Sequence, residues 1–433
     1  MLAEFALAHA KKLGATASEA EASASVGQTV TVRMREVETI EYNRDKGLSV
    51  TVYFGHQRGS ASTSDFSREA IERTVAAACA IARYTAADEF SGLADPARLA
   101  HAPFPDLALH DPWDISVDDA IALATETEAA AFAVDHRINN SEGASVSSHE
   151  ADFIYANSDG FMGGYPTTRA SVSASMIAGT DSGMQRDYWY TTARGPAGLE
   201  PAEAVGRKAG ARTIARLDSR RIKTCEVPVL FDPGMASGLI GHFVSAVSGS
   251  SLYRRSSFLL DSMDTPVFSP LVTIREEPLL PKGLASSPFD AEGVAAVPRD
   301  VVRDGVVRGY FLASYSGRKL GLATTGNAGG NHNLIVQPGA LGFEQLVAKM
   351  GRGLVVTELM GQGVNNVTGD YSRGAVGFWV EAGEIRFPVE EVTIAGNLKD
   401  IYRNIIAVGN DVLALGSKHV GSILIGQMAI AGE

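Results

Sequence analysis

Cysteine, closely spaced histidine and long apolar runs are scarce or absent in this sequence. Its two cysteines, Cys79 and Cys225, are too few for a disulfide framework or a cysteine-rich metal site. So low a count is typical of proteins from a reducing compartment. No segment approaches the ~18 consecutive apolar residues that indicate a membrane span. We therefore predict a cytoplasmic protein that does not associate with a membrane.

The N-terminal segment also lacks the features of a signal peptide. No basic residues precede its apolar positions, and these positions are spaced as on one face of a helix. That face would carry Leu2, Phe5, Ala6, His9, Ala10 and Leu13. The segment is therefore predicted to be an amphipathic helix of the folded protein.

Basic clusters are weak as well. The formal net charge is −12, and the densest basic patch consists of Arg220, Arg221 and Lys223. Affinity for nucleic acid rests largely on cationic side chains that displace counterions from phosphates. A patch that follows a predicted helix is more typical of a solvated helix end. The composition therefore argues against nucleic acid as a partner.

The length of 433 residues, with 45% hydrophobic and 20% charged residues, is that of a soluble protein of two or three domains. The first predicted unit spans residues 1–90. Apolar residues alternate over Val30–Met34 and Leu48–Phe54, which predicts two strands, and Asp45-Lys46-Gly47 can turn the chain between them. A helix is predicted from Ser67, with a core stripe of Ile71, Val75, Ala78, Cys79 and Ala82.

Prolines mark a linker over residues 91–115, and a second α+β unit is predicted over residues 116–222. Ser116 has the position of an N-cap for a helix that runs to about Val134. Alternating strands follow, and another helix is predicted to start at Pro201.

Residues 223–433 have a different pattern, in which short strands are separated by glycine. Asp304-Gly305 and Ala382-Gly383 each lie between alternating segments, which predicts a β-hairpin at each place. Short helices are predicted around residues 233–247, 341–350 and 398–406. The predicted fold class is therefore α+β, with small N-terminal α+β units followed by a mostly antiparallel β C-terminal domain.

The nine histidines are scattered, and no two of them are closer than nine residues. Two zinc ligands on one helix face require histidines three or four residues apart, as in HExxH. His149-Glu150 begins like that motif, but no second histidine follows. We therefore predict no helical zinc site and no cofactor bound by this chain. The alternative is a site assembled from distant histidines.

Signals for other catalytic mechanisms are equally weak. The sequence has no Gly-x-Ser-x-Gly elbow and no GxxxxGK[ST] phosphate loop. Neither cysteine has a histidine or basic activator beside it in the sequence. Residues 325–332 could bind an anion through backbone N–H groups, although a tight structural loop is the favoured interpretation. No catalytic residue is predicted.

Polar, glycine-rich loops with aromatic residues are the positive feature of the C-terminal half. Glycine lets one backbone approach another, which suits pairing with an extended peptide or a second subunit. Glycines that merely serve bends at sheet corners explain the pattern equally well.

Several long segments of this half resemble the PmbA/TldE family: YRRSSFLLD, KGLASSPFDAEGV, SYSGRKLGLATTGNAGGNHN, GLVVTELMGQGVNNVTGDYSRGAVGFWVE and EVTIAGNLKDIYRNI. They occur in the family's order, and the resemblance covers nearly all of residues 225–433. It implies a pairing with TldD, a paralogue of the same fold. In the family, TldD holds catalytic zinc through a His-Glu-x-x-x-His helix and a later cysteine.

The corresponding positions of this chain lack those ligands. Residues 234–249 match the zinc helix, but His242 is followed by Phe243 and no second histidine occurs there. The C-terminal stretch SKHVGSILIGQM has no cysteine. The resemblance therefore implies a subunit without zinc, and zinc is expected on the partner.

The activity that the resemblance implies is proteolysis of unfolded peptides, including leader-peptide removal in microcin maturation and antitoxin degradation. The family name "modulator of DNA gyrase" refers to genetic effects of that proteolysis. This chain is predicted to serve the interface and present the peptide, without being catalytic alone. Candidate channel or interface residues are Tyr253, Arg254, Arg255, Phe289, Asp290, Tyr371 and Arg373. The alternatives are a regulatory homodimer that acts without TldD and a self-sufficient hydrolase with an unrecognised site.

Overall fold

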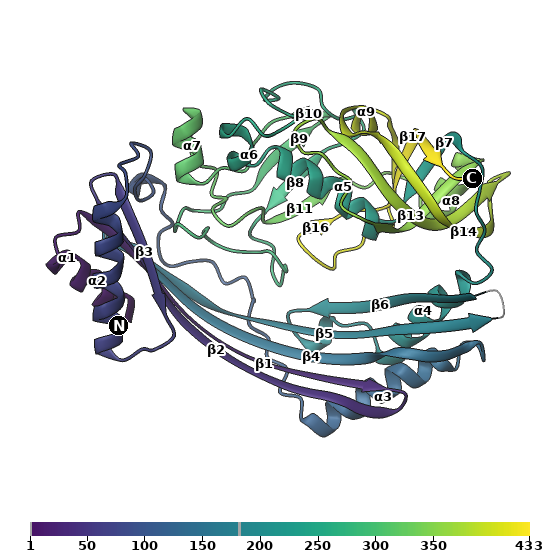
Figure 1. Ribbon diagram of the computed structural model, residues 1–433, viewed down its shortest axis with the longest axis horizontal. Coiled ribbons are helices and arrows are strands. Elements are labelled where there is room, and N and C mark those ends of the chain that lie inside the picture. Colours follow the sequence, from purple (N-terminus) through teal and green to yellow (C-terminus); the bar gives the residue numbers. More distant parts are fainter. Residues whose placement is uncertain (1, 181–182) are drawn as a thin grey trace.

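A long curved antiparallel sheet forms the N-terminal half of the molecule (Figure 1). The computed structural model describes residues 2–180 and 183–433. The strand order is β3-β2-β1-β4-β5-β6. The strands are β1 (Ala17–Arg33), β2 (Glu36–Phe54), β3 (Gln57–Thr63), β4 (Ile138–Asn157), β5 (Met162–Thr180) and β6 (Gly183–Ala193).

This sheet unites the two N-terminal units that the sequence predicts. β1 of the first unit pairs with β4 of the second, from Glu19 opposite Asn157 to Val32 opposite Ala144. The boundaries at residues 90 and 116 remain predictions, but the strands on either side of them belong to one sheet.

Helices cover the two ends of the sheet (Figure 1). They are α1 (Leu2–Lys12) and α2 (Arg68–Tyr84) at one end, and α3 (Val117–Phe132) and α4 (Ala202–Ala215) at the other. The helix predicted from Ser67 is α2, and Ser67 caps it by accepting the N–H of Ala70. The N-cap predicted at Ser116 is confirmed, because Ser116 accepts the N–H of Asp119 at the start of α3. The predicted apolar stripe of α2 is buried against the sheet. α1 buries mainly small residues, namely Ala3, Ala6 and Ala10.

The turn predicted at Asp45-Lys46-Gly47 is wrong, because β2 runs through these residues without a break. The chain turns instead at Met34 and Arg35, whose φ angles are 52° and 68°. The buried carboxylate of Glu128 on α3 accepts the backbone N–H groups of both residues, at 2.9 and 2.8 Å. A contact from a distant helix thus stabilises a left-handed turn that contains no glycine.

The C-terminal domain contains two smaller sheets above the long one (Figure 1). The first has the order β14-β13-β12-β7-β17-β15, with β7 (Cys225–Phe231), β12 (Gly353–Met360), β13 (Asp370–Glu381), β14 (Glu384–Asn397), β15 (Ile405–Val408) and β17 (Ile423–Ala431). The second has the order β10-β9-β8-β11-β16, with β8 (Ile274–Glu277), β9 (Arg299–Arg303), β10 (Val306–Val307), β11 (Asn333–Val336) and β16 (Lys418–His419).

Short helices complete this domain: α5 (Pro233–Ala246), α6 (Gly249–Tyr253), α7 (Ser314–Leu320), α8 (Phe343–Met350) and α9 (Leu398–Arg403). The helices expected around 233–247, 341–350 and 398–406 correspond to α5, α8 and α9, whereas α6 and α7 were not predicted. Both expected hairpins form, with Arg303 opposite Val306 and Glu381 opposite Glu384. Most strand pairs are antiparallel, and the predicted α+β class is confirmed.

The largest apolar core lies inside the C-terminal domain, around α5 and the sheet beside it. Phe243 of α5 packs edge-to-face on Phe268, with ring centroids 5.0 Å apart. Among the described helices, none combines the length and apolar composition needed to cross a membrane.

Candidate functional site

Helix α5 is the segment that the sequence aligns with a zinc-binding helix. Its N-terminus is fixed by Asp232, whose side chain accepts the N–H of Met235 at 2.8 Å, and Pro233 occupies the first turn. Leu239, Ile240 and Phe243 are buried in the domain core. His242 is half-buried, and its ring lies 5.9 Å from that of Tyr371 on β13.

Tyr371 and Arg373 are two residues apart on β13, so their side chains share one face of that strand. Tyr371 is 2% exposed. Its hydroxyl group and the Nε–H of Arg373 are buried without a geometrically acceptable hydrogen-bond partner in the described part of the chain. Burial raises the pKa of Tyr371 to about 12, although the nearby Arg373 guanidinium counteracts part of this rise. Tyr371 therefore remains a protonated donor at neutral pH.

Basic side chains gather beside α5. Lys418 of β16 is half-buried, and a Cβ atom placed on Gly241 would lie 3.6 Å from its Cε. Burial lowers the pKa of Lys418, and burial together with Arg373 lowers the pKa of His242. No carboxylate of the described residues forms an ion pair with Arg373 or Lys418 at 4.0 Å or less. We call His242, Arg373 and Lys418 the α5 basic cluster.

This arrangement does not fit a divalent metal. The turn after His242 presents Ala246 and Val247, which are 0% exposed and carry no ligand atoms. Within residues 2–180 and 183–433, no group of three or more His, Cys, Asp or Glu side chains is placed to hold a metal ion. The Arg373 guanidinium near His242 would also repel a dication. The α5 basic cluster is suited instead to a carboxylate or another anion.

A pocket of about 460 Å³ lies between the second N-terminal unit and the C-terminal domain, and His419 of β16 lines it. Arg194 contributes to its wall and is 8% exposed. Its guanidinium donates to the carbonyl oxygens of Thr168, Gly283 and Leu284, at 2.9 to 3.3 Å. Burial lowers the pKa of both Arg194 and His419.

The predicted residues Tyr253, Arg254 and Arg255 lie at the end of α6 and directly after it. Tyr253 packs edge-to-face on Tyr315 of α7, with ring centroids 5.7 Å apart. Arg254 donates from Nε to the Tyr253 hydroxyl oxygen at 3.1 Å. Arg254 and Arg255 are exposed. Arginine and tyrosine are both enriched at protein interfaces. The interface or channel role of residues 253–255 stays a prediction.

Phe289 and Asp290 lie in the interior, where the C-terminal domain meets the long sheet. Phe289 is 2% exposed and packs on a group of aromatic rings: Phe104, Phe153, Phe161 and Tyr165. Asp290 accepts the N–H groups of Glu292, Val294 and Ala328, at 2.9 to 3.0 Å. Burial raises the pKa of Asp290 to about 6, although these three donors act against the rise.

The seven predicted residues therefore occupy three places. Tyr371 and Arg373 share a strand face, Tyr253 to Arg255 lie at α6, and Phe289 and Asp290 lie at the domain junction. The described hydrogen bonds, ion pairs and ring contacts do not join these places to one another. His242 stood out in the sequence because it lies in the segment that matches the zinc helix, but its proximity to Arg373 was not predicted. Lys418 carried no sequence signal.

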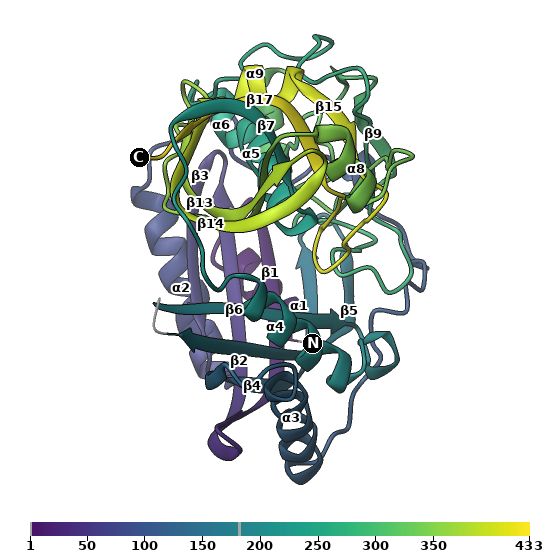
Figure 2. The ribbon, with the colours of Figure 1, turned by 90° about the vertical axis from the view of Figure 1, so that its right-hand side faces the viewer.

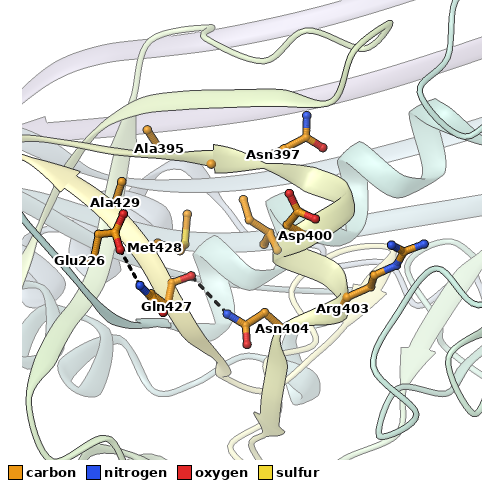
Figure 3. Close-up of a pocket in the computed structure, with 11 residues that line it drawn as sticks. Glu226, Ala395, Asn397, Asp400, Arg403, Asn404, Gln427, Met428 and Ala429 are labelled. Carbon is orange, nitrogen blue, oxygen red and sulfur yellow. Dashed lines mark hydrogen bonds between the residues drawn. The ribbon is translucent and has the colours of Figure 1, made fainter.

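A second pocket, of about 560 Å³, lies between β14, α9 and β17 and holds none of the predicted residues (Figure 3). Its wall is polar: the Gln427 side chain donates to Glu226 at 2.6 Å, and Asn404 donates to the Gln427 carbonyl oxygen at 3.4 Å. Asp400 and Arg403 project from α9 beside it. The described residues around it offer no nucleophile paired with a base, so we assign no chemistry to it.

Comparison with known sequences gives a match along most of the chain. Residues 19–82 match the PmbA/TldA metallopeptidase domain 1, residues 110–217 match the central domain, and residues 224–432 match the C-terminal domain. The protein named Metalloprotease PmbA of Escherichia coli O157:H7 is 49% identical over 99% of this chain and 94% of its own length. A Metalloprotease PmbA homolog of Haemophilus influenzae is 46% identical over 99% of this chain and 95% of its own length.

Solved structures give the same result at the level of the fold. A Bacteroides thetaiotaomicron protein described as a modulator of DNA gyrase superposes with a TM-score of 0.95 at 29% identity, covering 100% of this chain and 98% of that one. TldE from Thermococcus kodakarensis superposes with a TM-score of 0.87, covering 99% of both chains. Its sequence identity of 19% restricts that likeness to the fold.

Proposed function

The chain belongs to the PmbA/TldD family, and from this membership we propose that it is a subunit of a two-subunit zinc metallopeptidase that cleaves unfolded peptides. In this proposal a TldD-like partner holds the zinc, while this chain forms part of the interface and presents the substrate. The two subunits act in the cytoplasm. Leader-peptide removal and antitoxin degradation are the reactions they would serve.

The observation that carries the proposal is the α5 basic cluster. The helix that would hold zinc has His242 and then the apolar residues Ala246 and Val247 one turn later. Arg373 brings positive charge to His242, and Lys418 lies against the neighbouring Gly241 of the same helix. A chain with this arrangement is suited to binding at that position and cannot supply a metal-bound hydroxide there.

The cluster has the chemistry to hold a carboxylate of a peptide or of the partner subunit. Arg373 offers donors in a planar fork, and its buried Nε–H lacks a described partner. The Tyr371 hydroxyl group, protonated at neutral pH, is a second donor at the same face. Zinc on the partner would activate water and polarise the scissile carbonyl, while these groups would hold and orient the bound chain.

Reconstitution tests the division of labour. The purified chain, a TldD-like zinc subunit and their mixture are each incubated with an unfolded peptide, and cleavage is followed by mass spectrometry. We expect cleavage by the mixture at least about tenfold faster than by either subunit alone, because one supplies zinc and the other binding. Metal analysis of this chain alone is expected to give far less than one zinc per chain.

The α5 basic cluster is tested in the same assay with Arg373→Gln. We expect KM for an unfolded peptide to rise about tenfold with a smaller change in kcat, since a charge-assisted contact to the bound chain is lost. The matched control is Arg386→Gln. Arg386 is exposed on β14, the strand next to β13, and it pairs with Glu384 of the same strand. Chelator-sensitive cleavage by this chain alone would refute the proposal, and so would a mixture no faster than the zinc subunit.

A further inference from the structure

The pocket beside Arg194 combines an apolar wall with a small number of ionisable side chains. The long sheet lies below the C-terminal domain in Figure 2, and β6 is on the side of the sheet that faces this domain. The segment that ends β6 and residues 280–284 of the C-terminal domain both line the pocket. Its volume of about 460 Å³ is in the range of small-molecule sites. Its apolar residues are Ala193, Ala197, Leu280, Pro281, Leu284 and Ala414.

The positive charge of Arg194 has no counter-charge among the described residues. The side chain is almost wholly buried, and its hydrogen bonds go to backbone carbonyl oxygens. Burial and the nearby Arg169 guanidinium both lower the pKa of Arg194, so the surroundings oppose its charge. Buried charges in proteins are normally paired with an opposite charge. The adjoining pocket is the space in which a bound anion would supply one.

Lys282 holds a second cation at this pocket, and it does so in a strained backbone conformation. Its φ angle is 57°, which favours glycine over a lysine. The N–H of Lys282 donates to the Leu107 carbonyl oxygen at 2.7 Å, and its Nζ lies 2.8 Å from the Asp111 carboxylate. Strain that surrounding contacts maintain is found most often at functional sites. The position of Lys282 therefore directs attention to what its ammonium group binds.

The ionisable groups of the described lining leave an excess of positive charge. Asp111 is the acidic residue among them, and it is already paired with Lys282. Burial lowers the pKa of His419, so its ring is neutral at neutral pH and does not change this balance. Arg194 therefore remains uncompensated, although the chain as a whole has a formal net charge of −12. A positive excess in an apolar pocket fits an anionic group that is attached to an apolar body.

We propose that this pocket binds the C-terminal residue of a peptide, with the carboxylate beside Arg194 and Lys282 and an apolar side chain against the apolar wall. A free amino acid fits less well, because its ammonium group would add positive charge to a positive site. The described lining includes no member of the α5 basic cluster, so this is a separate site. The inference takes the peptide as ligand from the proposed function, but binding to this chain alone requires no cleavage.

Ligand-observed NMR of the full chain, without a zinc subunit, tests the proposal with N-acetyl-leucine as the probe. This compound carries the carboxylate and apolar side chain of a peptide end, and we expect a dissociation constant on the order of 1 mM. N-acetyl-leucinamide, which lacks the carboxylate, should bind at least about tenfold more weakly. Free leucine and inorganic phosphate should each bind at least about threefold more weakly, because one adds a cation and the other lacks the apolar body.

Variants of the pocket assign the bound ligand to this place. Lys282→Gln should raise the dissociation constant for N-acetyl-leucine about tenfold, whereas Asp111→Asn should lower it about threefold, because Lys282 is then no longer neutralised. Ala414→Phe should abolish binding by filling the pocket. Arg308→Gln is the control, since Arg308 is exposed and pairs with Asp264 outside the pocket. Circular dichroism of each variant verifies the fold, and a damaged fold would not give changes of opposite sign.

Several results would overturn the proposal. Binding of N-acetyl-leucinamide as tight as that of N-acetyl-leucine would show that the carboxylate is not recognised. Tighter binding of free leucine would exclude a peptide end as the preferred ligand. Unchanged binding in both Lys282→Gln and Ala414→Phe would place the ligand elsewhere, and a chain that binds none of the probes up to about 10 mM has no such site. Each result is obtained without the zinc subunit, so it leaves the outcome of the reconstitution experiment open.

Discussion

Arg194 should be among the residues that most strongly fix the C-terminal domain on the long sheet. It follows directly after β6 and is 8% exposed, yet no acidic partner lies within ion-pair distance among the described residues. Its guanidinium is held by the carbonyl oxygens of Thr168, Gly283 and Leu284. Two of these carbonyls belong to the C-terminal domain, so the side chain spans the junction. Replacement by alanine would leave all three carbonyls without this donor.

The size of the effect follows from two opposing terms. The Gly283 carbonyl keeps the N–H of Ser286 as a donor, so the carbonyls of Thr168 and Leu284 are the two that lose the Arg194 donor without this replacement. Each unpaired buried carbonyl costs on the order of 1 kcal/mol or more, which gives about 2 kcal/mol for two of them. Removal of the buried charge returns part of its desolvation cost, which is the reason that burial lowers the pKa of Arg194. Water in the adjoining pocket can also reach some of the freed carbonyls. We therefore expect Arg194→Ala to lower the free energy of unfolding by about 2 kcal/mol.

Urea unfolding, followed by tryptophan fluorescence and by circular dichroism, measures this loss. Arg194→Lys should lie between the original chain and the alanine variant, since an ammonium group keeps the charge but does not match the planar fork. Arg169→Ala is the control: this exposed arginine repels Arg194, so its removal should be neutral or slightly stabilising. A loss below about 1 kcal/mol for Arg194→Ala would refute the reasoning, and so would full stability of Arg194→Lys.

Two further predictions concern the interior. Gly377→Ala should destabilise the chain by about 2–4 kcal/mol in urea unfolding, because a Cβ atom there would lie 1.7 Å from the Val355 carbonyl oxygen. The control is Gly238→Ala on α5, which has open space around it and should be neutral or stabilising. A loss of similar size in both variants would contradict this. Asp290 has a pKa raised to about 6 in the folded state. Between pH ~4 and 6 it therefore binds more protons in the folded state than in the unfolded state, and its contribution to stability is lost as pH rises through that window. The stability of the original chain relative to Asp290→Asn should therefore fall by at most about 3 kcal/mol from pH 4 to 7, and a constant difference would show that Asp290 does not titrate as stated.

Local signals in the sequence predicted the elements that local forces determine. Ser67 and Ser116 mark helix starts because their hydroxyl groups satisfy backbone N–H groups a few residues away. Asp304-Gly305 and Ala382-Gly383 form hairpin turns because these residues adopt positive φ angles. The α+β class follows from the sum of such elements.

Contacts between residues that are distant in the chain could not be predicted from such local signals. The turn at Met34 and Arg35 depends on Glu128, which is more than 90 residues away in the chain. The union of two predicted units into one sheet depends on the pairing of β1 with β4. For the candidate site, the polar loops were found by their composition, but composition does not tell an interior residue such as Phe289 from an exposed one such as Arg254.

The arrangement beside α5 bears directly on whether this helix can hold a metal ion. Here Arg373 places positive charge beside His242, Lys418 lies against the neighbouring Gly241, and the described residues provide no carboxylate that neutralises either cation at ion-pair distance. Restoring one or two ligands would therefore not be sufficient for zinc, because the Arg373 guanidinium would still repel it. The same charges favour an anionic group of a peptide or partner, which is the physical basis for assigning this chain a binding role in the proposed complex.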